Sequence, residues 1–193
     1  KRLALKRYQF HPGEGLYTDM NAIRRDEDLD NLHSAYVDQW DWEKIIEAQD
    51  RTVDYLKATV RDIVGALRDT QSFLRSVFPQ LCVFPEIPEE ITFITTQELE
   101  DLYPDLTPKQ REHAFVKDHP VTFLMGIGGK LKSGKPHDGR APDYDDWNLN
   151  GDLLCWDSVN GQSLEISSMG IRVSPESLDR QLTLAGCDDR PEL

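Results

Sequence analysis

One apolar stripe in the first half of the chain constrains the fold more than any other feature. Apolar side chains recur there at intervals of three and four residues: Val53, Leu56, Val60, Ile63, Val64 and Leu67. This spacing is the period of an α-helix, so it predicts a long amphipathic helix from Glu43 to about Ser76, ended by Pro79. The chain has 193 residues and is 38% hydrophobic. That is enough for one globular domain with a sizeable core, or for a large part of a bigger one.

The rest of the chain alternates short strand patterns with short helix patterns. Strands are predicted over 36–43, 90–95, 121–129, 152–159 and 163–173, and helices over 97–103, 108–118 and 175–186. Thr96 and Thr107 are expected to cap the first two of these helices, and Asn160-Gly161 to join the last two strands in a hairpin. Residues 11–33 are expected to form a loop, because they are rich in proline, glycine and charge. Since several strands are adjacent or hairpin-linked, the pattern predicts an α+β fold with a mostly antiparallel sheet.

The strand at 36–43 has an aromatic face and a polar face. Its period of two divides the side chains into one set of Tyr36, Asp38, Trp40 and Trp42 and another of Val37, Gln39, Asp41 and Glu43. We expect the aromatic set to anchor the strand in the core. The polar row then faces either a ligand pocket or a wet sheet edge, and periodicity alone allows both.

Composition narrows the class of partner. Acidic residues outnumber basic ones 35 to 22, a net charge of −13 that disfavours non-specific binding to nucleic acid. No apolar run is long enough to span a bilayer, and no signal leader opens the chain, so we expect no membrane partner. The three cysteines form no C-x-x-C pair, which favours reduced thiols in a cytoplasmic protein. The five histidines show no metal-binding spacing.

Two charged segments are candidates for binding small ligands. Arg24 and Arg25 precede a run of acids, and an arginine at a strand end can hold a phosphate or carboxylate through two parallel hydrogen bonds. The alternative is a solvated turn with surface ion pairs. The segment RAPDYDDW at 140–147 clusters carboxylates around Arg140, which suits an ammonium group or a divalent ion. An ordinary acidic loop is the alternative, although Tyr144 and Trp147 weaken it.

The predicted hairpin near the C-terminal end could hold a metal ion. Asp152 and Glu165 lie on its two strands and could together bind Mg²⁺ on a nucleotide's phosphates, or they could simply be polar sheet edges. Strict alternation places Glu165 with Ser167 on one face and Ser168 with Arg172 on the other. The glycine-rich GIGGK at 126–130 lacks the spacing of a phosphate-binding loop and is expected to be a bend.

Several longer blocks resemble one enzyme family. GEGLYTDM, HSAYVDQWDWE, GIGGKL, RAPDYDDW, LNGDLLCW and EISSMGIR occur in the order found in the ammonia-dependent asparagine synthetases of the A type, the aspartate–ammonia ligases. That family is similar to the catalytic domain of class II aminoacyl-tRNA synthetases. The resemblance implies a single catalytic domain over 1–193, an antiparallel sheet flanked by helices, and a homodimer. It also implies formation of asparagine, AMP and pyrophosphate from aspartate, ammonia and ATP with Mg²⁺, through a β-aspartyl adenylate.

The resemblance further implies roles for individual residues. Arg24 and Arg172 would be catalytic, with Arg24 on the α-phosphate; Arg25 remains an alternative to Arg24, because Arg25 with Glu27 also fits the synthetase pattern. The residues implied to bind aspartate are Lys1, Gln39, Asp41, Arg140, Asp145, Ser167 and Ser168. Those implied to lie at the nucleotide are Arg24, Glu27, Ser34, Val37, Asp152 and Glu165, of which Asp152 and Glu165 would also bind the metal.

The chain departs from the family pattern at three places. It begins at the substrate lysine, carries little of the family's lid loop between Trp147 and Leu149, and ends before a glycine-rich helix that binds ATP. A polypeptide that truly lacked these segments is expected to be inactive. Two other functions remain open: a class II aspartyl- or asparaginyl-tRNA synthetase domain, and a non-catalytic paralogue of one.

Overall fold

The computed structural model describes residues 1–25, 28–30 and 33–187, and the chain divides into two compact units, Lys1–Arg51 and Thr52–Leu193. Each unit is described by itself. The expectation of a single catalytic domain stays a prediction.

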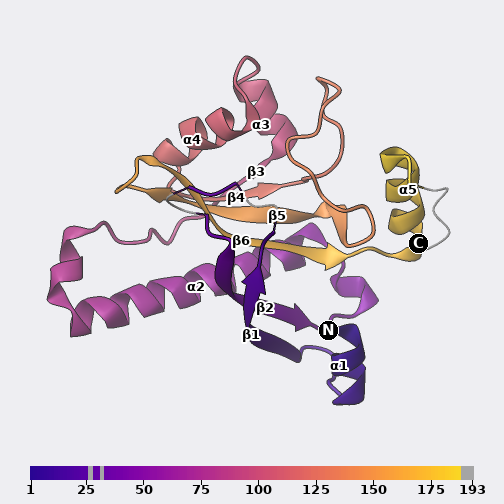
Figure 1. Ribbon diagram of the computed structural model, residues 1–193, viewed down its shortest axis with the longest axis horizontal. Coiled ribbons are helices and arrows are strands. Elements are labelled where there is room, and N and C mark those ends of the chain that lie inside the picture. Colours follow the sequence, from indigo (N-terminus) through magenta and orange to yellow (C-terminus); the bar gives the residue numbers. More distant parts are fainter. Residues whose placement is uncertain (26–27, 31–32, 188–193) are drawn as a thin grey trace. The chain divides into compact units, whose positions relative to one another are not determined.

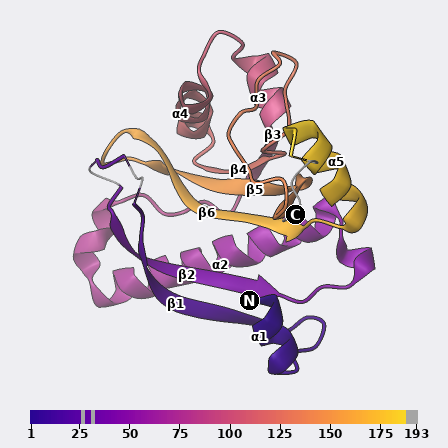
Figure 2. The same ribbon diagram turned by 45° about the vertical axis from the view of Figure 1, so that its right-hand side comes forward.

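The first unit is built on a two-stranded hairpin (Figure 2). It contains α1 (Arg2–Arg7), β1 (Gly15–Ile23), β2 (Tyr36–Lys44) and the short 3₁₀ helix η1 (Ala48–Asp50). β1 and β2 pair antiparallel over their whole length, from Gly15 opposite Lys44 to Ile23 opposite Tyr36. The prediction of a loop over 11–33 is therefore wrong for β1. Pro12 and Gly13 precede the strand and the charge run follows it, while the residues from Gly15 to Ile23 form a nine-residue ladder with β2.

The prediction that the aromatic face of β2 is buried is also wrong. Tyr36, Trp40 and Trp42 are 59%, 82% and 38% exposed, whereas the polar face is half-buried and Glu43 is only 9% exposed. The partners of these polar-face residues on β1 are Leu16, Thr18, Met20 and Ala22, which lie beside them on the same face of the hairpin. Side chains alternate between the two faces whatever their polarity, so periodicity fixed which residues share a face but not which face is covered.

The second unit contains a four-stranded sheet in the order β3-β4-β5-β6. Its strands are β3 (Thr92–Thr95), β4 (Val121–Met125), β5 (Asp145–Asp157) and β6 (Gln162–Arg172). β3 and β4 are parallel, and the other two pairings are antiparallel, so the expected mostly antiparallel sheet is confirmed. The helices are α2 (Val53–Val77), α3 (Thr96–Leu102), α4 (Pro108–Asp118) and α5 (Pro175–Ala185), with the 3₁₀ helix η2 (Pro79–Val83).

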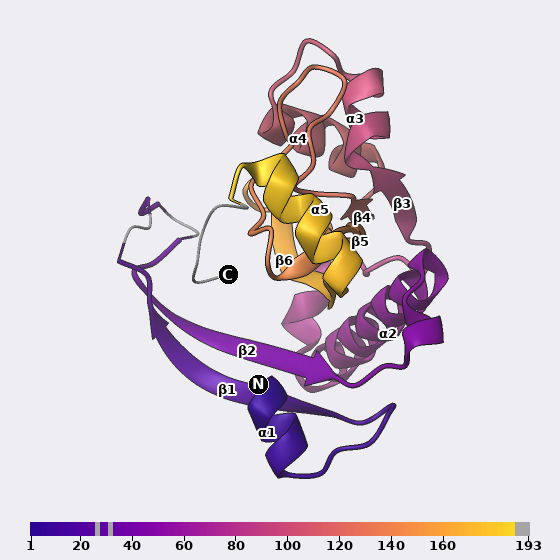
Figure 3. The same ribbon diagram turned by 90° about the vertical axis from the view of Figure 1, so that its right-hand side faces the viewer.

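Helices cover both faces of this sheet (Figures 1 and 3). On one face α2 packs its apolar stripe against the strands, in a cluster of Leu56, Val60, Val64, Val121, Phe123, Leu153 and Met169. On the other face α3 and α4 form a second cluster of Ile94, Leu99, Phe115, Val116, Leu124 and Leu154. The α+β fold with a sheet flanked by helices is therefore confirmed. Adjacent residues of β5, Leu153 and Leu154, are buried in different clusters because they point to opposite faces.

Helix boundaries show where local signals were decisive. α2 begins at Val53, ten residues later than predicted, because Thr52 Oγ1 accepts a 3.1 Å hydrogen bond from the Tyr55 amide and caps it. Thr95, and not the predicted Thr96, caps α3. The Thr107 cap of α4 is confirmed. Gly186 ends α5 in the left-handed conformation at φ 65°, which glycine adopts without strain. Among the described helices, none is long and apolar enough to cross a membrane.

Candidate active site

The polar face of the hairpin gathers five residues of the first unit. Val37, Gln39, Asp41 and Glu43 alternate along β2 with their side chains on one side. Lys1, which precedes α1, joins them: its Nζ makes an ion pair with the Asp41 carboxylate and lies 3.9 Å from Glu43 Oε2. An ammonium group beside two carboxylates can bind a zwitterionic ligand by exchanging partners with it. Four of the five, all but Glu43, are residues for which the sequence predicted a site role.

Arg24 and Ser34 lie together at the far end of the same hairpin. Arg24 follows the last residue of β1, and its amide donates a 2.8 Å hydrogen bond to the Ala35 carbonyl, which extends the ladder by one step. Ser34 Oγ accepts a 3.3 Å hydrogen bond from the Tyr36 amide. Arg25 is the next residue, so the hairpin end holds both candidate guanidiniums. The predicted site residue Glu27 lies outside the described residues.

In the second unit, an irregularity in β6 decides which acids share a face. Asp152 pairs with Ser168, whereas two residues further along β5 Leu154 pairs with Glu165. Ile166 has no partner in this register, as expected for a β-bulge. Paired residues point to the same side of a sheet, so the bulge brings Glu165 to the face of Asp152 and Ser168. The prediction from strict alternation, which separated Glu165 from Ser168, is wrong.

Ser167 does not join this group. It pairs with Leu153, which is fully buried in the cluster under α2, so Ser167 lies on the opposite face from Ser168. The face of β5 and β6 that carries Asp152 is the one covered in part by α3 and α4.

Two arginines bind carboxylates on this face. Arg140, from the segment between β4 and β5, makes an ion pair with Asp152 and donates a 2.9 Å hydrogen bond to Ser168 Oγ. Arg172, at the end of β6, donates a 2.5 Å hydrogen bond to Asp145 Oδ1 at the start of β5. The predicted site residues of the second unit other than Ser167 therefore share one sheet face.

Tyr144 was missed as a partner of Arg172. The carbon of the Arg172 guanidinium lies 3.3 Å from the centre of the Tyr144 ring, so the cation stacks on an aromatic face while it binds Asp145. The sequence marked Tyr144 only as an aromatic residue in a charged segment. Tyr144 and Arg172 are 28 residues apart, and nothing in the sequence indicated that they are in contact.

The two acids predicted to bind metal both have a raised pKa. Burial raises the pKa of Asp152, and Arg140 only partly opposes this. Burial also raises the pKa of Glu165, and the charge of Asp152 raises it further. A divalent cation would relieve such a carboxylate pair. In the described part of the chain, no group of three or more acidic, histidine or cysteine side chains could hold a metal ion. Mg²⁺ is commonly bound by one or two carboxylates together with substrate phosphates, so this pair fits that ion.

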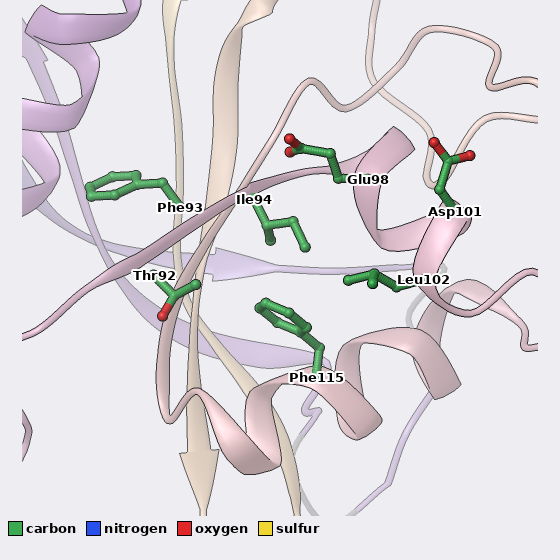
Figure 4. A pocket seen from close by; sticks show the side chains of 7 residues that line it. All are labelled: Thr92, Phe93, Ile94, Glu98, Asp101, Leu102 and Phe115. Atoms are coloured by element: carbon green, nitrogen blue, oxygen red, sulfur yellow. The ribbon is translucent and has the colours of Figure 1, made fainter.

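A separate pocket of about 450 Å³ lies between β3, α3 and α4 (Figure 4). Its lining consists of Thr92, Phe93, Ile94, Glu98, Asp101, Leu102 and Phe115. The figure shows Ile94, Leu102 and Phe115 turned toward a common apolar space, with two carboxylates near its rim. None of the predicted site residues lines this pocket.

Comparison with known proteins first identifies the class. The fold is similar to that of an Entamoeba histolytica asparaginyl-tRNA synthetase in complex with asparaginyl-adenylate, with a TM-score of 0.58 and 13% sequence identity. The match covers 92% of this chain and 42% of that one. At this identity the likeness defines the fold alone, which is that of a class II aminoacyl-tRNA synthetase catalytic domain.

The family follows from sequence. A family model described as aspartate-ammonia ligase matches residues 1–193, and the chain belongs to this family. Relatives named aspartate–ammonia ligase from Clostridium perfringens and Levilactobacillus brevis are each 60% identical over 193 residues, and one from Bacillus cereus is 59% identical over 192. The matches cover 100% of this chain but only 57%, 57% and 58% of those relatives. The chain thus spans somewhat more than half the length of its curated relatives.

Proposed function

We propose that the protein containing this chain converts L-aspartate and ammonia to L-asparagine, with cleavage of ATP to AMP and pyrophosphate. The observation that most supports this proposal is the sheet face carrying Arg140 with Asp152 and Arg172 with Asp145, in a chain of the aspartate–ammonia ligase family. Paired guanidinium and carboxylate groups suit a ligand that is itself both cationic and anionic, as an amino acid is. The guanidinium groups also suit a nucleotide's phosphates.

Aspartate would be recognised through its three charges. We assign Asp145 to the α-ammonium group, and Arg140 and Lys1 to carboxylates, with Lys1 on the side-chain carboxylate that reacts. We assign four further contacts to aspartate: Gln39, Asp41, Ser167 and Ser168. Of these, Ser167 lies on the opposite sheet face from Ser168.

In the first step, an oxygen of the aspartate side-chain carboxylate would attack the α-phosphorus of ATP and displace pyrophosphate. Two anions must meet in this step, so Arg24 and Arg172 are assigned to stabilise the charge on the phosphoryl oxygens. Glu27, Ser34 and Val37 are assigned to the nucleotide. Asp152 and Glu165 would hold Mg²⁺, which when bound supplies positive charge to the polyphosphate.

In the second step, neutral ammonia would attack the acyl carbon of the β-aspartyl adenylate. The C–N bond forms, the acyl–oxygen bond to AMP breaks, and a carboxylate accepts the surplus proton. We further propose that the protein acts as a homodimer in the cytoplasm. The three free cysteines, Cys82, Cys155 and Cys187, fit a reducing compartment.

One assay tests this proposal against its alternatives. The full-length protein is given aspartate and Mg²⁺–ATP together with ammonium, glutamine or tRNA. Asparagine and AMP formed with ammonium alone would support the ligase. Charging of tRNA would replace it with the synthetase alternative, which the fold also allows. No turnover with any acceptor would favour the non-catalytic paralogue.

A further inference from the structure

Glu112 and His137 form a buried pair on the α4 side of the sheet, and the proposed function uses neither. His137 Nε2 lies 2.9 Å from Glu112 Oε1, and the two side chains are 1% and 5% exposed. Lys109 Nζ donates a 2.9 Å hydrogen bond to the other oxygen, Oε2. Burial tends to raise the pKa of Glu112, but His137 and Lys109 hold it below its ordinary value. Glu112 is therefore an ionised carboxylate inside the protein with both oxygens paired.

The imidazole depends on this one partner. His137 Nδ1 is buried and makes no hydrogen bond to any part of the chain that the structure describes. Nε2 is consequently the atom through which the ring is held. A buried polar group with a single partner is costly to leave unpaired, so replacing Glu112 frees the His137 ring to move, and replacing His137 removes the attachment altogether while Glu112 keeps Lys109.

His137 lies within the segment that joins β4 to β5, which runs beside α3 in Figures 1 and 3. Contacts with helices hold this segment on either side of His137. Before it, Ser133 Oγ donates a 2.8 Å hydrogen bond to Glu100 Oε1 of α3. After it, Gln181 Nε2 of α5 donates a 2.9 Å hydrogen bond to the Pro142 carbonyl. Between these two contacts, the buried hydrogen bond from His137 to Glu112 attaches the segment to α4.

Arg140 follows His137 by three residues. Its guanidinium reaches Asp152 on β5 and, over 2.9 Å, Ser168 on β6. Three residues of extended chain span at most about 10 Å. The place where the His137 ring is held therefore limits where the backbone of Arg140 can lie.

We propose that Glu112 and His137 are positioning residues that fix Arg140 in the aspartate-binding site. They touch no substrate in this proposal and act through the backbone between His137 and Arg140. The substrate role of Arg140 rests on the proposed function, whereas its placement by the buried pair does not. The competing explanation is that the pair only stabilises the packing of α4.

The chain offers a matched control on the same helix. His113 is the residue after Glu112, and its Nδ1 lies 2.7 Å from Ser163 Oγ on β6. Its bond joins α4 to the sheet but does not involve the segment that carries Arg140. His113→Ala therefore removes a comparable histidine contact without the proposed positioning effect.

The first experiment needs no activity. Hydrogen–deuterium exchange of the full-length protein is followed over residues 133–143 in the wild type and in the His137→Ala, Glu112→Gln and His113→Ala variants. Faster exchange in the first two variants, about tenfold, with unchanged exchange in the third, is expected. His137→Gln can still offer an N–H to Glu112 and should restore part of the protection. Unchanged exchange in both His137→Ala and Glu112→Gln would overturn the proposal.

The second experiment measures coupling to Arg140. His137→Ala should raise the KM for aspartate about tenfold with kcat changed less than about threefold, and it should add nothing in an Arg140→Ala background. Effects that multiply in the double variant would show that the pair acts on stability alone. A wild-type protein without ligase activity would refute the proposed function while leaving the exchange experiment decisive. If His137→Ala fails to fold, Glu112→Gln, which preserves shape, takes its place in both experiments.

Discussion

Gly170 on β6 and Asp145 at the start of β5 occupy neighbouring space that leaves no room for a side chain on the glycine. A Cβ atom built on Gly170 would lie 2.8 Å from both Cβ and Cγ of Asp145. The absent side chain is therefore what lets the Asp145 carboxylate lie over β6 and reach Arg172. Glycine is therefore the only residue type at position 170 that leaves the ion pair of Asp145 and Arg172 undisturbed.

Replacing Gly170 by alanine should displace Asp145 and weaken aspartate binding. We expect the KM for aspartate to rise at least tenfold and the free energy of unfolding to fall by about 1–3 kcal/mol, as in other overpacked sites. Steady-state kinetics and urea titration of the full-length protein measure the two effects. Gly129→Ala is the control, since its Cβ would approach no atom closer than the 4.0 Å to Trp147. An unchanged KM in Gly170→Ala would show that Asp145 does not contact the substrate.

Arg172→Ala should abolish adenylate formation. The guanidinium binds Asp145 and stacks on Tyr144, so its position is fixed before any phosphate arrives. We expect aspartate-dependent exchange of pyrophosphate into ATP to fall by about 10³-fold or more, and Arg172→Lys to rescue it poorly because an ammonium group lacks the planar fork.

A surface arginine serves as the control for this change. Arg180 is 52% exposed and lies 3.6 Å from Asp146, so Arg180→Ala removes a peripheral ion pair and should leave exchange within about twofold. Near-normal exchange in Arg172→Ala would remove Arg172 from the catalytic residues.

The cap of α3 should make a pH-dependent contribution to stability. The Thr95 backbone and hydroxyl donate hydrogen bonds of 2.8 and 2.7 Å to Glu98, and they lower the pKa of that carboxylate. A lowered pKa in the folded state means that the contribution is present at neutral pH and is lost as the pH falls through the carboxylate's range. Glu98→Ala should therefore cost about 0.5 kcal/mol at pH 7 and almost nothing near pH 3.

α4 supplies the comparison for this measurement. Its cap has the same arrangement, but the reciprocal side chain is the uncharged Gln110, bound to Thr107. Thermal unfolding of Gln110→Ala should show a loss that does not change with pH. A pH-independent loss in Glu98→Ala would contradict the assignment of its stabilising effect to the ionised form.

The cysteines should differ sharply in reactivity. Burial raises the pKa of the Cys155 thiol to about 11, whereas Cys82 is exposed. At pH 8 only about one Cys155 side chain in a thousand is a thiolate, the reactive form. Iodoacetamide followed by peptide mass spectrometry should find Cys82 alkylated within minutes and Cys155 protected until the protein is unfolded. Equal rates at the two sites would show that Cys155 is accessible.

The elements that the sequence predicted best are those with a long apolar pattern or with clear signals for the start or end of a helix. The apolar stripe of α2, the Pro79 that follows it and the Thr107 cap all acted locally, and the structure confirms them. β1 was missed because its pairing partner lies 13 residues beyond its end, across a charged segment. The exposure of the two faces of β2 was predicted backwards, since alternation fixes which residues share a face but not which face is exposed.

The candidate site, like the fold, was predicted only in part from the sequence. The family resemblance named most of the residues that the second unit brings to one face, among them Arg140, Asp145 and Asp152. The resemblance could not reveal the bulge that places Glu165 and Ser167 on opposite sheet faces, because one unpaired residue does not change the composition of the strand. Glu112 and His137 were missed altogether. They are 25 residues apart, and neither belongs to a motif.

The bulge in β6 has a practical use. Ile166 is paired with no residue of β5 and is 41% exposed, so it is released from the alternation that governs its neighbours. A fluorophore attached at that position would need no space in either core cluster. Because Ile166 is next to Glu165 in sequence, a change in the fluorophore's emission on addition of Mg²⁺ would test the proposed binding of a cation by Glu165 and Asp152.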